Sequence, residues 1–186
     1  FFFISNTFAQ SGSQSPYSRY GLGDNQFGGF VPQLAMGGFS IAHFDTLNLN
    51  VSNAASYSTL KFTLIEAAVR ADYTISQING SKSDNNNGGL GYVAIGFPVI
   101  YKKWGSSFGV IPFTSTGYNL ITYGKISDTV IYANNYKGNG GLNRFYWGNG
   151  FRISNNISAG FNASYLFGTI EKSRNTEFTE SGYYNS

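Results

Sequence analysis

The stretch from Phe62 to Ser76, FTLIEAAVRADYTIS, decides the fold class. Its charged side chains all fall on even-numbered positions, whereas its odd-numbered positions are apolar apart from Thr63. Successive side chains of a strand point to opposite faces, so the pattern predicts a β-strand with one apolar face and one charged face. Globular strands usually end after about five or six residues, while a tilted strand that crosses a bilayer needs about 9–11. The length therefore favours a membrane-spanning strand.

The composition agrees with such strands. Only 11% of the residues are charged, against roughly 25% in an ordinary soluble domain, while 18% are aromatic and 24 of the 186 are glycine. The longest apolar stretch, from Val93 to Tyr101, is interrupted by Gly96 and Pro98 and is far shorter than the ~20 residues of a spanning helix. The net charge of +3 is small and unclustered, which excludes a nucleic-acid surface as the main function.

The sequence offers no catalytic or metal-binding constellation. It has no cysteine, which excludes disulfides and thiolate metal sites, and its single histidine, His43, has no paired ligand or nucleophile. There is no G-x-S-x-G motif, and the GLGD of residues 21–24 lacks the strand, the lysine and the helix of a phosphate loop. We therefore expect no enzyme, no cofactor and no metal.

Four further segments alternate between apolar and polar side chains after the first one, which runs from Lys61 to about Ile78. The five predicted strands cover residues 61–78, 90–101, 107–124, 141–153 and 157–170. The last is the most regular, because its odd positions from Ile157 to Phe167 carry only aliphatic or aromatic side chains. This pattern predicts an all-β fold, an antiparallel transmembrane β-barrel of which about five strands are present.

The connections between these strands alternate in length. The segment around Asp84 and the segment 126–140 are long, whereas those at Lys102–Gly105 and Asn155–Asn156 are short. Outer-membrane barrels have long extracellular loops and short periplasmic turns, so this alternation places the first strand running outward. Trp104, next to two lysines, suits an aromatic belt at the inner interface. The alternatives are a soluble β-sandwich and a repeat adhesin, which also show alternation and glycine-rich turns.

The regions before the first strand differ from the rest. Residues 1–9, FFFISNTFA, begin with an apolar run and carry small residues at Thr7 and Ala9, the −3 and −1 positions of a signal peptidase site, as in the tail of a secretory signal peptide. Residues 10–60 lack a period of two and are rich in Gly, Ser and Asn, so we expect an irregular or short-helical plug. Residues 61–186 are expected to form the first part of a larger outer-membrane barrel, with a polar end from Glu171 onward that carries no further strand.

Three segments carry a resemblance to a known family. They are Ser15–Asp24, Ala35–Phe62 with its Gly37-Gly38 pair, and Gly140–Gly168 with Gly160, Asn162 and Tyr165 in a Gly-x-Asn-x-x-Tyr pattern. Together they resemble FadL-type outer-membrane transporters of hydrophobic compounds, in which a Gly-Gly pair and an Asn-Pro-Ala motif precede the first strand. The present chain has Asn53-Ala54-Ala55 there, without the proline. The plug motif implied by the resemblance is therefore Gly37, Gly38, Asn53 and Ala55.

The resemblance implies a monomeric barrel of about fourteen strands in the outer membrane of a Gram-negative-type envelope. The N-terminal segment would fill it as a hatch, and small hydrophobic molecules such as long-chain fatty acids would pass through and leave sideways into the lipid. Other functions remain open. A nonspecific porin would conduct ions without binding fatty acids, and a structural or adhesive envelope protein would do neither.

Five residues are candidates for such passage. Pro98 and Pro112 lack the N–H that strand pairing needs, so a bulge or gap is expected near the periplasmic side, either as a lateral exit or as a tolerated irregularity. Glu66, Arg70 and Asp72 would point inward, where they could hold the hatch, line a polar route or form wall-stabilising salt bridges. Arg70 is also a candidate partner for a carboxylate head group.

Overall fold

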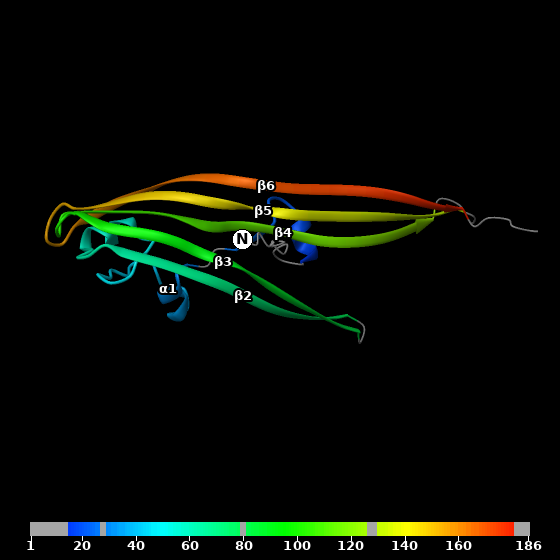
Figure 1. The fold of residues 1–186 in the computed structure, drawn as a ribbon, viewed down its shortest axis with the longest axis horizontal. Coiled ribbons are helices and arrows are strands. Elements are labelled where there is room, and N and C mark those ends of the chain that lie inside the picture. The colour runs from blue at the N-terminus through cyan, green and yellow to red at the C-terminus, as the bar shows by residue number, and fades with distance from the viewer. Residues whose placement is uncertain (1–14, 27–28, 79–80, 126–129, 181–186) are drawn as a thin grey trace, which may run out of the picture.

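A single antiparallel sheet dominates the computed structural model, which describes residues 15–26, 29–78, 81–125 and 130–180. Five long strands follow one another in sequence order, β2-β3-β4-β5-β6, and a short strand, β1, pairs with β4 (Figure 1). All of these pairings are antiparallel. The predicted all-β fold is confirmed.

Four of the five long strands are longer than the sequence pattern predicts, whereas the first begins at Leu64 and not at Lys61. The five are β2 (Leu64–Ile78), β3 (Ser81–Ile100), β4 (Trp104–Lys125), β5 (Val130–Arg152) and β6 (Ser158–Glu180). With 20 to 23 residues each, β3 to β6 exceed the about 9–11 residues that cross a bilayer.

The predicted long loops are wrong. The asparagine-rich segment around Asp84 belongs to β3 and pairs with β2 through Asp84↔Ile75 and Asn87↔Asp72. Likewise most of segment 126–140 belongs to β5, and the polar stretch after Glu171 continues β6 to Glu180. A β-ladder is held by backbone hydrogen bonds, so it continues past the apolar side chains on which the prediction relied.

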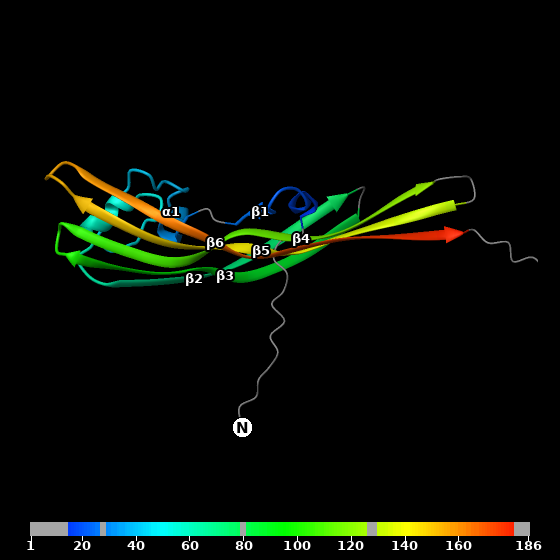
Figure 2. The ribbon, with the colours of Figure 1, turned by 90° about the horizontal axis from the view of Figure 1, so that it is seen from above.

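The N-terminal segment forms short helices against one face of the sheet (Figure 2). They are η1 (Pro16–Arg19), α1 (Val31–Ala35) and η2 (Ala54–Thr59), and β1 covers Asp24–Asn25. We call residues 15–60 the hatch. Its short-helical character agrees with the expectation from sequence, while residues 1–9, the expected signal remnant, lie outside the described residues.

The sheet divides between β3 and β4. Their ladder runs from Ile100↔Trp104 to Val93↔Val110 and ends there. Beyond that point the β2–β3 hairpin diverges from the layer of β4, β5 and β6 (Figure 1). β1 pairs with β4 just past the end of this ladder, through Asp24↔Ser115 and Asn25↔Thr114. A hatch strand therefore takes the position that β3 leaves.

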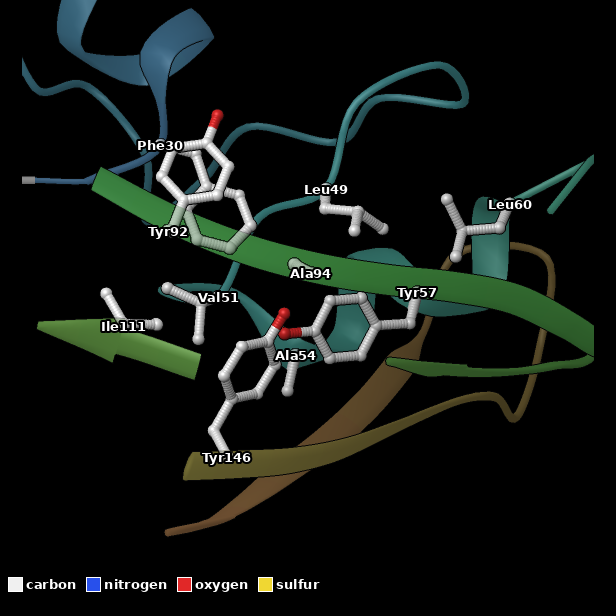
Figure 3. Packing of buried hydrophobic residues seen from close by; sticks show 10 residues of the cluster. All are labelled: Phe30, Leu49, Val51, Ala54, Tyr57, Leu60, Tyr92, Ala94, Ile111 and Tyr146. Carbon is white, nitrogen blue, oxygen red and sulfur yellow. The ribbon is translucent and has the colours of Figure 1, made fainter. Parts of the chain in front are cut away.

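The core lies between the hatch and the sheet (Figure 3). The hatch contributes Phe30, Leu49, Val51, Ala54, Tyr57 and Leu60, and the sheet contributes Tyr92, Ala94, Ile111 and Tyr146. The Phe30 ring stacks on that of Tyr92, with centroids 4.1 Å apart. The opposite face of the sheet exposes large apolar side chains, among them Ile65, Val69, Val93, Phe108, Phe145, Trp147 and Phe161.

Within the part of the chain that the structure describes, no helix has the length and apolar character needed to cross a membrane.

Candidate functional site: the hatch seat and the opening in the wall

Four glycines from three neighbouring strands form a flat floor beneath η2. They are Gly105, Gly148, Gly150 and Gly160, which we call the glycine seat. A Cβ added to any of them would collide with η2, and at Gly160 it would lie 2.5 Å from the carbonyl carbon of Ala54 and the nitrogen of Ala55. Ordinary carbon contacts are about 3.5–4.0 Å. The backbone of η2 therefore rests directly on the backbone of the wall.

Two polar side chains fasten η2 beside this seat. The Asn162 amide nitrogen of β6 donates to the Val51 carbonyl at 2.7 Å, and the Tyr57 hydroxyl donates to Asn162 Oδ1 at 3.3 Å. Tyr57 is only 1% exposed, and burial raises the pKa of its hydroxyl. Figure 3 shows the Tyr57 and Tyr146 rings pointing toward one another within the core. The Tyr146 hydroxyl also lies 2.9 Å from Ser107 Oγ.

Glu66 and Arg70 on β2 both contact the hatch backbone. Glu66 Oε1 accepts a hydrogen bond from the Leu49 N–H at 2.5 Å, and Arg70 Nη1 donates to the Gln26 carbonyl at 2.6 Å. Asp72 pairs with Arg70, with 2.7 Å between Oδ2 and Nε. The structure thus places the three predicted inward charges on one strand face, where two of them bind the hatch and the third binds Arg70.

The plug-motif glycines end α1. The N–H of Gly38 donates to the Gln33 carbonyl at 2.8 Å, and the N–H of Gly37 donates to the Leu34 carbonyl at 3.0 Å. Both glycines have positive φ angles, 72° at Gly37 and 84° at Gly38, which residues with a side chain rarely adopt. These residues therefore turn the chain out of the helix.

Asn53 and Ala55, the other two motif residues, lie at the start of η2. Asn53 precedes the helix, and its carbonyl accepts from the Ser56 N–H at 3.0 Å and the Ser56 hydroxyl at 2.7 Å. The Ala55 carbonyl accepts from the Ser58 hydroxyl at 2.7 Å. Serine hydroxyls thus reinforce a turn that lacks the proline of the FadL-type motif.

The loop before η2 is ordered by Asp45 and Asn50. Asp45 accepts hydrogen bonds from the Leu47 N–H and the Asn48 amide, at 2.9 and 2.7 Å. Burial works to raise the pKa of Asp45, but these hydrogen bonds outweigh it and hold that pKa below its ordinary value. The Asn50 amide donates to the carbonyls of Ser40 and His43, at 2.6 and 3.1 Å. The hydrogen bonds of Asp45 and Asn50 thereby fix this loop near its start and near its end.

The two prolines lie beside irregularities of the β3–β4 hairpin. Pro98 is opposite Gly105, next to a register shift between Pro98 and Ile100. The β2–β3 ladder begins only at Leu64↔Gly96, so Pro98 lies past the end of β2. Pro112 lies two residues past the last β3–β4 pair, next to a shift in the β4–β5 register. Pro112 thus adjoins the point where β3 and β4 separate past Val93↔Val110, which we call the opening in the wall.

A cavity of about 570 Å³ lies between the hatch and the β2–β3 hairpin. The hatch side is formed by Asn25, Gln26, Gly29, Val31 and Leu34, and the hairpin side by Ala68, Val69, Arg70, Ala71, Gly91 and Tyr92. Polar and apolar surface line it in about equal parts, and Arg70 is the only charged side chain among the described residues of the lining. The cavity has the size and polarity of a site for a small amphiphilic molecule.

The glycine seat and the role of Asn162 were not predicted. The sequence did carry a signal for the seat. Gly148 and Gly150 are two residues apart and so share one strand face, and Gly160 pairs with Gly150 on the neighbouring strand. Glycine weakens a strand and often marks close approach of another backbone. Among the described residues, no group of three or more His, Cys, Asp or Glu side chains could hold a metal ion.

The fold and this site define an all-β wall protein with an N-terminal hatch built into one face of the sheet. The family model of BamG matches residues 1–186, the whole sequence, and the chain therefore belongs to the BamG family. This family places it in association with the outer membrane. The searches of curated proteins and of solved structures returned no match. BamG is a different family from the FadL-type transporters, and the FadL-type assignment stays a prediction.

Proposed function

We propose that this chain is a membrane-embedded component of the machinery that assembles the outer membrane, where it acts as a hatch-filled scaffold. The BamG family match supports an assembly-related role. The observation that carries the scaffold role is the glycine seat, because η2 rests on the wall backbone at Gly105, Gly150 and Gly160 with no side chains between. A hatch seated in this way holds the wall rigidly in shape.

Membrane embedding is supported by the outward face of β6. Its odd positions from Ala159 to Phe167 are apolar, whereas those from Glu171 to Glu177 are charged or polar. About ten residues of a strand span about 33 Å along the strand, and a tilt of about 45° reduces this to about 23 Å across the membrane. That height corresponds to the ~25 Å apolar band of outer-membrane barrels. We infer that this half of each long strand faces lipid and that the other half extends beyond it.

Depletion of the full-length protein tests the assembly role. Newly made outer-membrane β-barrel proteins would be pulse-labelled, and their folded, membrane-inserted fraction would be measured over time. We expect that fraction to fall severalfold on depletion and to recover with the wild-type gene. Unchanged insertion of every barrel tested, with the protein fully depleted, would refute the assembly role.

Passage of small hydrophobic molecules is the second candidate, and the cavity beside the opening favours it. Arg70 lines the cavity, and the lining residues Gly91 and Tyr92 directly precede Val93, where β3 and β4 separate. Replacing Pro98 and Pro112 with valine in the full-length protein should impair uptake of a labelled long-chain fatty acid while the barrel still folds. Unchanged uptake would contradict a lateral exit there. Conductance in planar bilayers without fatty-acid binding would indicate a porin, and the absence of both would favour a structural or adhesive role.

A further inference from the structure

The edge of β4 that faces β3 is unpaired beyond the hatch. β3 leaves β4 at Val110, and β1 covers only Thr114 and Ser115. From Thr116 to Lys125 the described residues provide β4 with a strand partner on the β5 side alone. Figure 1 shows this part of β4 as the border of the three-stranded layer, with β2 and β3 turned away.

Gly117 shows which backbone groups face that edge. Its N–H donates to Ser18 Oγ of η1 at 3.2 Å, and its carbonyl accepts from the same hydroxyl at 3.4 Å. Both groups therefore point away from β5. The β4–β5 register is continuous from Thr114 to Lys125. Since alternate residues of a strand direct their N–H and C=O groups to the same edge, those of Asn119, Ile121 and Tyr123 face the free edge as well.

The side chains of this edge are of the kind that allows another strand to pair with it. Residues 114–124, TSTGYNLITYG, contain no charge and no proline, and they are rich in β-branched and aromatic side chains. Proteins usually protect a free edge with charges, prolines or very short strands. The corresponding part of β3, SKSDNNNGG at residues 81–89, does carry charged, asparagine and glycine residues. Of the two strands that separate here, β4 is the one whose described residues carry no such protection.

The hatch already demonstrates that this edge accepts an antiparallel segment. β1 pairs with Thr114 and Ser115, and the Gln26 N–H donates to the Phe113 carbonyl at 3.0 Å. Past β1, Ser18 of η1 binds Gly117, and among the described residues those without a partner on this edge begin beyond it, at Asn119. An added segment would continue the same ladder along the rest of β4.

We propose that the β4 edge from Asn119 to Tyr123 binds an extended segment of a partner protein, which adds to the sheet as an antiparallel strand. Recognition would come from the backbone groups of Asn119, Ile121 and Tyr123, and specificity from alternate side chains of the segment. This proposal rests on the proposed function, because it names the surface through which the chain joins other components of an outer-membrane assembly machine.

The test uses the full-length protein in native membranes, with a photoreactive benzophenone side chain in place of Tyr123, which is 76% exposed. After irradiation, cross-linked peptides would be sequenced by mass spectrometry. We expect adducts at one short, contiguous segment of one other protein. Hydrogen exchange should also show the amides of residues 119, 121 and 123 protected in membranes that contain this partner and exposed after the partner is removed.

Two variants at Ile121 make the test specific. Ile121→Pro removes the edge N–H without removing a bond to β5, and losing one such bond should lower the adduct yield about fivefold. Ile121→Val keeps the N–H and should leave the yield unchanged. Equal yields from both variants would overturn strand addition.

The remaining outcomes also decide the proposal. Adducts to another copy of this chain, or to another part of the same chain, would overturn it in favour of self-pairing or of closure by the chain's own wall. No adduct, together with rapid exchange of the three amides in native membranes, would overturn it as well. If depletion leaves barrel insertion normal but a specific adduct to a partner forms, the assembly role is refuted and the proposed binding edge is supported.

Discussion

Gly160→Ala tests the seating of the hatch most directly. The added methyl group would lie 2.5 Å from the carbonyl carbon of Ala54, and an ordinary contact requires η2 to move away by about 1 Å. That movement would stretch the 2.7 Å hydrogen bond from Asn162 to Val51 beyond bonding distance. Overpacking costs about 1–3 kcal/mol and a lost hydrogen bond about 1 kcal/mol, so we expect a destabilisation of about 2–4 kcal/mol.

Gly89→Ala is the matched control. Gly89 lies in β3, and a Cβ added there meets no atom within 4 Å. The control should therefore be neutral or slightly stabilising, by up to about 1 kcal/mol. Both variants would be reconstituted in lipid vesicles at full length, and hydrogen exchange of residues 51–58 and urea unfolding would be measured. Equal exchange and equal unfolding midpoints for Gly160→Ala and Gly89→Ala would refute the seat as the source of hatch stability.

Three further predictions concern the hatch contacts. Glu66→Ala leaves the Leu49 N–H without its partner and should destabilise the folded protein by about 1–3 kcal/mol, measured by urea unfolding in vesicles. The depressed pKa of Asp45 stabilises the folded loop at neutral pH, and this contribution should disappear as the pH falls below 3.8. Hydrogen exchange of residues 45–49 should therefore accelerate in acid in the wild type but show no such transition in Asp45→Asn. Lys172→Met removes a cation whose Nζ donates to the Arg19 carbonyl at 2.9 Å, and exchange should increase locally in residues 17–21 without a change in the unfolding midpoint.

The strand faces could be predicted from sequence because they depend on a local period of two. On β2, Ile65 and Val69 are exposed on one face, while Glu66 contacts the hatch on the other. On β5, Phe145 and Trp147 are exposed and Tyr146 is buried. In each case neighbouring side chains of one strand carry the information.

The ends of the strands could not be predicted in the same way. Asn85, Asn86 and Asn87 have low β propensity, yet they pair with Thr74, Tyr73 and Asp72. Their place in the ladder depends on β2, whose register with β3 is already set by apolar pairs farther from the turn, such as Ile65↔Ile95 and Ala67↔Val93. The length of a β-ladder is a property of both strands and cannot be predicted from the sequence of either strand alone.

Close to the point where β3 and β4 separate, the side chains of β4 that face the hatch change from odd to even positions, and the sequence pattern does not reveal this change. On β4, Ile111 is buried at an odd position and Tyr118 at an even one, because the register shifts between Pro112 and Thr114. A bulge adds one residue, which moves all later side chains to the opposite face.

The hatch binds β4 at the point where β3 has left it. Past the shift, β4 has lost β3 as a neighbour, and its next backbone groups bind β1 and Ser18 of the hatch. The hatch is held again at η2 by the glycine seat and at Gln26 by Arg70. None of these hatch contacts uses the β4 residues from Asn119 to Tyr123, so a segment could pair there while the hatch stays seated. The seat of the hatch and the edge proposed to bind a partner thus lie on different residues, as a scaffold that binds partners by strand addition requires.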